Sequence, residues 1–372
     1  MLKLDRAAPA SKGLLQCDDL GFIQDASVSK SFQGLLFALM LYAAATPAEV
    51  VRNLHSAQVP VIDQGRSALA SASRDALAEV LVKVSGSEEV LQHPEIIAAL
   101  PEARSHVQQY AYVRDEQTGD ELSARFEFDD SFINRLLTNA RLPLWTANRP
   151  RVLVWMAVEI DGVRQWVSFA DTPGLAAELV SAFERRGVPV QLPLFDLADA
   201  TTIGLGDIWE LRGMAVQSAS VRYNAENLLV GRAVLLSNGQ WTGDWSYLYG
   251  NHRLDRSSQA PGAAGFMRDG VALAAEEMAS RYAVAPTGIT DDRVHLVVHG
   301  VVDFSDYTAI VKWLESLELI EHANIASISG DRVEFGLDAA ADAAQLASII
   351  QLNKRLQPQD ALPGELVYQW TN

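Results

Sequence analysis

The stretch NLLVGRAVLLSNGQWTGDWSYLYG, residues 227–250, carries the clearest structural signal in the chain. Two runs of apolar, β-branched and aromatic residues flank Asn238-Gly239, and an Asn-Gly pair in this setting is the strongest short signal of a β-hairpin. The run RVLVWMAVEI at 151–160 predicts a buried strand upstream, and the apolar pattern from Gly262 to Tyr282 predicts a long helix downstream. The hairpin therefore has a neighbouring strand and a helix that can cover it.

Side chains of an extended strand alternate between two faces, which divides the second hairpin strand sharply. One face carries the aromatic residues Trp241, Trp245, Tyr247 and Tyr249. The other face carries Thr242, Asp244 and Ser246. An exposed aromatic row can stack on sugars, whereas a half-buried strand gives the same pattern when helices cover it. We favour core packing and keep the four aromatic residues as candidate binding residues.

Three blocks of mixed secondary structure follow one another after residue 48. Residues 49–148 read as strand, helices and a hairpin, and residues 149–286 hold the stretch quoted above. Residues 291–372 read as βαββαβ, the order of ferredoxin-like domains, a fold that hosts too many functions to imply one. We predict an α+β protein of three small domains in tandem, the last ferredoxin-like, with Asn148-Arg149-Pro150 as the first seam and a linker at 285–288.

Local signals give the ends of several helices. Apolar residues recur at helical spacing from Leu69 to Val84, and Gly86 ends that helix. Asp130 or Ser131 is expected to cap the last helix of the first block. In the second block a helix opens at Thr172-Pro173 and a strand, VPVQLPLF, follows it, which gives the order strand, helix, strand.

A second informative stretch is SFQGLLFALMLYAAATPAEV, residues 31–50. A dozen apolar residues after Lys30 match the hydrophobic region of a secretory signal, which is shorter than the roughly 20 residues of a spanning helix. Small residues then predict cleavage between Ala48 and Glu49. The alternatives are a buried core helix and an uncleaved inner-membrane anchor, in which case this segment would be the only membrane contact.

The segment before the apolar run is unusual for an export signal. Residues 1–27 contain several aspartates, whereas the region before an export signal is short and basic. We hypothesise that translation starts at Val28, which would give the basic head VSKSFQGLL. Residues 1–48 are thus interpreted as an N-terminal extension and signal peptide, and the mature protein as periplasmic.

The net charge restricts the classes of partner, and the cysteine content restricts how the mature protein can be stabilised. The formal net charge is −17, which makes nucleic acid an unfavourable partner. The single cysteine, Cys17, lies before the predicted cleavage site, so the mature chain would have none. Stability must then come from packed cores, for which this length is ample.

Several segments resemble an uncharacterised proteobacterial family. These are VPVIDQGRSALASASRDALAEVLVKVSGSEEVLQHPEI, HVQQYAYV, NLLVGRAV, GQWTGDWSYLY and RYAV. Together they look like the family filed as domain of unknown function 2066, a resemblance that covers most of the chain from about Val51. It implies an exported envelope protein of unassigned activity, with no catalytic motif to transfer. The first block is also similar in pattern to the N-terminal domain of flagellar assembly protein T, and the second to N-terminal domains of Tol-type periplasmic proteins.

The sequence contains no familiar catalytic, metal or cofactor motif. Its histidines never form H-x-x-x-H on a helix, and there is no G-x-S-x-G. The run GLGDIW at 204–209 lacks the lysine of a phosphate-binding loop. We therefore assign no metal and no cofactor. Glu159 and Asp161 at a strand end could face a cleft with Asp171, where α/β sheets bind ligands; a solvated turn at Asp161-Gly162 is the alternative.

Three classes of function remain. The first is a non-catalytic adaptor or assembly factor of the cell envelope, favoured by tandem small domains, an acidic surface and the absence of a catalytic motif. The second is a binding module for cell-wall glycan or peptide, which would rest on the aromatic residues. The third is an enzyme with an unrecognised site. The expected partners are envelope proteins, with peptidoglycan as the alternative.

Overall fold

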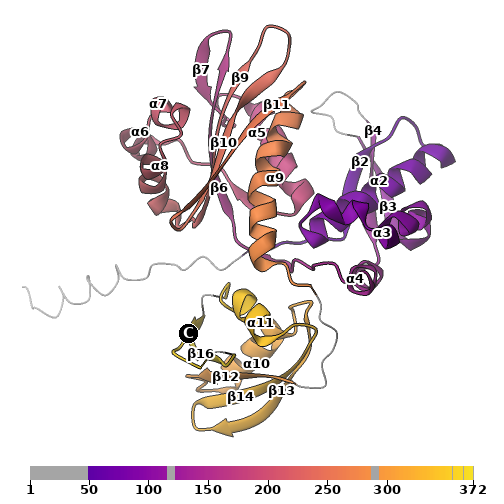
Figure 1. The fold of residues 1–372 in the computed structure, drawn as a ribbon, viewed down its shortest axis with the longest axis vertical. Coiled ribbons are helices and arrows are strands. Elements are labelled where there is room, and N and C mark those ends of the chain that lie inside the picture. The colour runs from indigo at the N-terminus through magenta and orange to yellow at the C-terminus, as the bar shows by residue number, and fades with distance from the viewer. Residues whose placement is uncertain (1–48, 115–121, 286–292, 354, 363, 372) are drawn as a thin grey trace, which may run out of the picture. The chain divides into compact units, whose positions relative to one another are not determined.

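The structure is a computed structural model. It describes residues 49–114, 122–285, 293–353, 355–362 and 364–371. These residues form helices and four separate β-sheets, so the predicted α+β class is confirmed (Figure 1). The predicted export signal, its cleavage site and the start at Val28 lie outside the described residues, except that Glu49 begins a short strand. None of the described helices is long and apolar enough to cross a membrane.

A six-stranded sheet is at the centre of the second block, residues 149–286. Its order is β11-β10-β9-β6-β7, with β8 also paired to β6. The strands are β6 (Val152–Ile160), β7 (Val163–Trp166), β8 (Val190–Gln191), β9 (Asn227–Leu235), β10 (Trp241–Tyr249) and β11 (His252–Ala260). Strands β6 and β9 run parallel, and the other neighbours along the path are antiparallel.

Helices cover the two faces of this sheet unequally. The helices α5 (Pro173–Arg186) and α9 (Ala263–Tyr282) lie on one face. Three short helices, α6 (Leu197–Thr202), α7 (Leu205–Trp209) and α8 (Gly213–Ser220), lie on the other. Figure 1 shows the two groups on opposite sides of the strands. The short helices bury Trp155, Val230 and Leu248 but leave another part of this sheet face uncovered.

The predicted hairpin at Asn238-Gly239 forms as the sequence indicates. Gly239 has φ +82°, a conformation that glycine adopts without a steric penalty, and the N–H of Leu236 donates to Gln240 at 2.8 Å. The next strand, β11, is not predicted, because HRLDRSSQA has almost no apolar residue and no clear alternation. It is a strand because it pairs along its whole length with β10 after a tight turn at Gly250.

The aromatic face of β10 packs beneath α9. Trp245 is fully buried, its ring 5.2 Å from that of Phe266 between centroids. Two glycines make room for it, since a Cβ at Gly231 would lie 2.4 Å, and one at Gly270 2.2 Å, from the indole ring. This close approach fixes the sheet against the helix.

The first block combines a three-stranded sheet with a long helix. Its strands are ordered β2 (Ser56–Pro60), β4 (Leu122–Phe128) and β3 (Val107–Arg114). The helical segments are α2 (Arg66–Ser85), η1 (Glu88–Gln92), α3 (Pro94–Ala99), η2 (Leu100–His106) and α4 (Asp130–Asn139). Helix α2 ends at Gly86 as predicted, with φ +83°. The cap of α4 is Asp129 instead of Asp130 or Ser131, because its carboxylate accepts from the N–H groups of Ser131 and Phe132.

The residues of the predicted seam at Asn148-Arg149 are closely packed in the structure. These residues form β5, which pairs with β1 (Glu49–Val50). The Arg149 side chain is completely buried and donates to the carbonyls of Lys83, Trp145, Thr146, Arg186 and Gly187 at 2.7–3.1 Å. Burial lowers its pKa to about 9, so the guanidinium still carries its charge at neutral pH.

The second block departs from the simple order strand, helix, strand. A hairpin strand, β7, follows β6 before α5 begins, and VPVQLPLF contributes only the short strand β8. The helix predicted from Thr172-Pro173 is present as α5 and ends at Gly187 with φ +61°. Helix α6 was not expected from the sequence.

The third block extends the predicted βαββαβ order by one strand. Its elements are β12 (Val294–His299), α10 (Phe304–Leu314), β13 (Ile320–Ser329), β14 (Arg332–Ala339), α11 (Ala343–Ile350), β15 (Leu356–Pro358) and β16 (Leu366–Trp370). The sheet order is β13-β14-β12-β16-β15. The added strand β15 reverses the chain before β16, so the closing strand runs parallel to β12.

Candidate functional site

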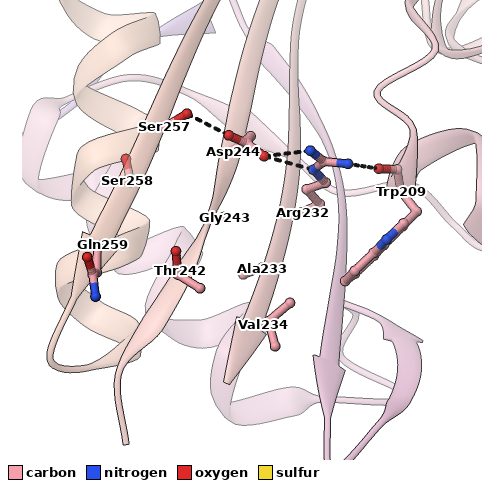
Figure 2. Close-up of a pocket in the computed structure, with 10 residues that line it drawn as sticks. All are labelled: Trp209, Arg232, Ala233, Val234, Thr242, Gly243, Asp244, Ser257, Ser258 and Gln259. Carbon is pink, nitrogen blue, oxygen red and sulfur yellow. Dashed lines mark hydrogen bonds and ion pairs between the residues drawn. The ribbon is translucent and has the colours of Figure 1, made fainter. Parts of the chain in front are cut away.

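A polar hollow lies on the part of the central sheet that the short helices leave open. It has a volume of about 480 Å³ and is lined by residues of β9, β10 and β11 together with Trp209 of α7 (Figure 2). It adjoins the carboxyl end of β9, which runs parallel to β6. Carboxyl ends of parallel strands are a common place for ligands in α/β sheets.

Strand register explains why polar side chains gather here. Arg232 of β9 lies opposite Asp244 of β10, and Asp244 lies opposite Ser257 of β11. Directly opposed residues of antiparallel strands share a face, so these three side chains form one row across the sheet. A second row contains Thr242 and its partner Gln259.

The first row is joined by short hydrogen bonds, as Figure 2 shows. The Nε and Nη2 of Arg232 donate to Asp244 Oδ2 at 2.9 and 2.7 Å. Ser257 Oγ donates to the other carboxylate oxygen at 2.6 Å. Arg232 Nη1 donates to the backbone carbonyl of Trp209 at 2.6 Å, which ties the helix α7 to the sheet. The row is therefore rigid before any ligand arrives.

This arrangement suits binding better than proton transfer. The Ser257 hydroxyl and the Arg232 guanidinium hold the pKa of Asp244 below its usual value, so the carboxylate stays ionised and both its oxygens have partners. A general base near neutral pH needs a raised carboxyl pKa. What the hollow offers a ligand is the hydroxyl of Thr242, the amide of Gln259 and the partly exposed charges of Arg232 and Asp244.

Glu159, predicted as a site residue, reaches the rim of this hollow indirectly. Its carboxylate accepts from Arg164 Nε at 2.9 Å, and the Arg164 guanidinium lies 4.0 Å above the centre of the Trp209 ring. A cation over an indole face at this distance is an attractive contact. These contacts, from Glu159 through Arg164 to Trp209, thus support the Trp209 ring, which forms one wall of the hollow.

Asp161 and Asp171 do not join Glu159. Asp161 is exposed in the β6–β7 turn with φ +51°, followed by Gly162 with φ +76°. Asp171 is exposed before α5 and accepts from Ser168 Oγ at 3.1 Å. Among the described residues no interaction links these carboxylates, so the geometry is that of the alternative interpretation, a solvated turn and a loop.

The four aromatic residues predicted on β10 lie on the opposite, covered face. Trp241, Trp245 and Tyr247 are buried, and Tyr249 is partly buried with its hydroxyl donating to Glu277 at 2.8 Å. Tyr247 donates to Asn227 Oδ1 at 2.6 Å inside the core. The buried rings of Trp241, Trp245 and Tyr247 are not available to stack on a sugar. Their burial agrees with core packing, the interpretation that we preferred.

Sequence reasoning placed Thr242 and Asp244 on a polar face but missed Arg232, Trp209 and Ser257. A usable signal existed for Arg232, because it is the only charged residue in the apolar run NLLVGRAVLL. Counting outward from the turn at Asn238-Gly239 places its side chain on the same face of the hairpin as that of Asp244. Ser257 could not be found, since its strand was not predicted. Within the described residues there is no group of three or more His, Cys, Asp or Glu side chains able to hold a metal ion.

Comparisons with known proteins give little functional information. Residues 48–146 match the model of a family described as a domain of unknown function (DUF8605). The match covers the first block, so that part of the chain is similar to an uncharacterised family. No curated protein matches the chain. One solved structure, titled "Crystal structure of uncharacterized protein", aligns at 11% identity over 36% of this chain and 90% of that chain, with a TM-score of 0.17, too low to carry an argument.

Proposed function

We propose that this protein is a non-catalytic adaptor that binds an extended polypeptide segment of a partner along the edge strand β11. One observation carries this proposal: β11 is the terminal strand of the central sheet and borders the polar hollow. A peptide added to such an edge gains main-chain hydrogen bonds, while pockets beside the edge read its alternate side chains.

The register shows which backbone groups are available. The turn at Gly250-Asn251 makes Tyr249 and His252 a hydrogen-bonded pair, so the N–H and C=O groups of even-numbered β11 residues point toward β10. Those of the odd-numbered residues point outward: Arg253, Asp255, Ser257 and Gln259. No backbone hydrogen bond to these outward groups occurs in the described part of the chain.

The edge and the hollow form one surface. Ser257 and Gln259 present outward backbone groups and also line the hollow. An added strand would therefore place alternate side chains beside Ser257 and Gln259, and long side chains could reach across β11 toward Thr242 and Asp244, two strand spacings or about 9–10 Å away. Hydroxyl and amide groups in the hollow suit a polar side chain of the partner, and the satisfied Arg232–Asp244 pair needs no rearrangement to accept it.

A partner segment fits this edge better than a second copy of the chain does. The edge strand carries mixed charges, Arg253 and Asp255, in an ion pair at 2.9 Å. Two whole copies would bring two net charges of −17 together, which opposes self-association. Dimerisation through β11 is thus an outcome that the experiment below must distinguish.

The setting of this adaptor is proposed from the sequence. The apolar run at 31–48 supports export to the periplasm, and the segments quoted above support kinship with domain of unknown function 2066. Envelope proteins would then supply the extended segment. The glycan alternative depended on an exposed aromatic row, and Trp245 and Tyr247 are fully buried. Within the part of the chain that the structure describes, no geometric feature favours the enzyme alternative over binding.

The test uses a random decapeptide library selected against the full chain, followed by affinity measurement on two variants. Ser257→Pro removes an outward N–H and leaves the ladder to β10 intact, which proline tolerates on an edge. Ser257→Ala removes the same hydroxyl and keeps the N–H. We expect Ser257→Pro to lose at least tenfold in affinity and Ser257→Ala much less, with both folded by circular dichroism. Equal affinity of Ser257→Pro and the parent, a library without binders, or peptide-independent dimers would contradict the proposal.

A further inference from the structure

A second cavity, lined by three arginines, lies away from the polar hollow. It has a volume of about 180 Å³ and is formed between α2, η1, α5 and α9. Its apolar lining consists of Ala78, Val82, Leu91 and Ala182. Its charged lining consists of Glu79, Glu88, Arg185, Arg186 and Arg268. A basic cavity is unexpected in a chain whose net charge is −17.

The arginines of this cavity retain unused hydrogen-bonding capacity. Arg186 has a side chain that is only 8% exposed; it contacts Glu88 at 3.1 Å and the carbonyl of Gly86 at 2.8 Å. Its Nε is buried without a partner in the described part of the protein. A buried donor without a partner costs free energy that a ligand oxygen can recover.

The other two arginines, Arg185 and Arg268, make fewer hydrogen bonds and ion pairs than Arg186 does. Arg185 is 3.8 Å from Glu79, beyond hydrogen-bonding distance. Arg268 is exposed and makes no ion pair or hydrogen bond with any described residue. Both belong to the rim, as does Glu88, whose side chain is 69% exposed. Three cations therefore face two carboxylates.

Glu79 adds to this imbalance. Burial raises the pKa of the Glu79 carboxyl above its usual value, and the nearby charges of Lys83 and Arg185 offset only part of this shift. Glu79 is therefore protonated more readily than an exposed glutamate. An incoming anion would meet an excess of positive charge in a site partly shielded from water, where charge-assisted hydrogen bonds are strong.

We infer that this cavity binds a small carboxylate with an apolar body, whose carboxylate contacts Arg186 and Arg268 and whose body contacts Val82, Leu91 and Ala182. Arginine suits a carboxylate because its planar donors match the two oxygens. Size limits the body: a cavity of about 150 Å³ accommodates benzene, so 180 Å³ fits a molecule the size of benzoate. A nucleotide is far too large.

The test is calorimetric titration of the full chain with benzoate, with neutral benzamide as the matched ligand control. Benzoate is expected to bind and benzamide at least tenfold more weakly. Arg268→Gln, at an exposed helical position, should weaken benzoate at least tenfold, whereas Arg74→Gln, the same change on an exposed part of α2 outside the cavity, should not. Ala78→Phe, which fills the cavity and keeps every charge, should abolish binding.

Several results would overturn the inference. These are no binding of benzoate, equal binding of benzamide, or benzoate affinity unchanged in Arg268→Gln and Ala78→Phe. Inorganic phosphate that binds Ala78→Phe as tightly as benzoate binds the parent would show that charge alone is recognised. Melting curves of each variant establish that it is folded, and Arg268→Gln keeps the test decisive if Ala78→Phe is destabilised.

Discussion

The two faces of the hairpin β9–β10 belong to the same strands and differ in how they are covered. On the face beneath α9, Trp245 is buried against glycines, and a single methyl group at Gly231 or Gly270 would collide with its ring. On the other face, Arg232 and Asp244 remain partly exposed and are joined by hydrogen bonds. Alternation along the strands thus separates a face whose residues determine stability from one whose residues remain available for binding.

The largest effect is expected on the covered face. Trp245→Ala removes a fully buried indole and leaves a cavity between β10 and α9. It should lower the free energy of unfolding by about 3–5 kcal/mol, measured by urea unfolding monitored by circular dichroism. A stable Trp245→Ala that loses affinity for peptidoglycan would instead support the binding platform and reverse the comparison.

A smaller effect is expected on the same face from Gly270→Ala, which should lower the free energy of unfolding although glycine-to-alanine changes in helices usually raise it. Alanine normally stabilises the interior of a helix relative to glycine by about 1 kcal/mol. At Gly270 of α9, however, the new Cβ would lie 2.2 Å from the indole of Trp245. Gly270→Ala should therefore destabilise by about 1–3 kcal/mol through overpacking. Trp245→Leu should partly relieve the effect of Gly270→Ala in the double variant; additive losses would show that the clash is not with this ring.

The smallest effect is expected on the open face. Asp244→Asn removes a partly exposed ion pair and should cost about 1 kcal/mol at neutral pH. The pKa of Asp244 is lowered in the folded state, so its contribution is present above the unfolded pKa of about 4 and is lost as the pH falls through the lower folded value. Urea unfolding between pH 7 and pH 3 should show the difference from the parent shrinking at the acidic end. A difference that is constant or grows toward pH 3 would contradict this account of the ion pair.

Local signals in the sequence predict many elements, and tertiary contacts explain the rest. The turn at Asn238-Gly239 and the helix end at Gly86 follow from backbone conformations that few residues adopt. Strand β11 could not be predicted, because pairing with β10 makes a strand of a polar segment. Burial of Arg149 was not predicted either, since charged side chains are rarely fully buried and its partners are backbone carbonyls of distant segments.

The candidate site was predictable only in part, for the same reason. Alternation places Thr242 and Asp244 on a polar face. Which part of that face stays open depends on where α7 lies, and α7 is anchored by the bond from Arg232 to the carbonyl of Trp209. Ser257 enters the site through a strand that has no sequence signal of its own.

The most direct test of the adaptor proposal is residue-level amide hydrogen exchange along β11, with and without a peptide selected as above. In the free protein the amides of Arg253, Asp255 and Ser257 should exchange much faster than those of Leu254 and Arg256, which face β10. Binding should slow the outward amides and leave the inward ones unchanged. Outward amides that are protected in the free protein, or that remain fast when the peptide is bound, would contradict the account.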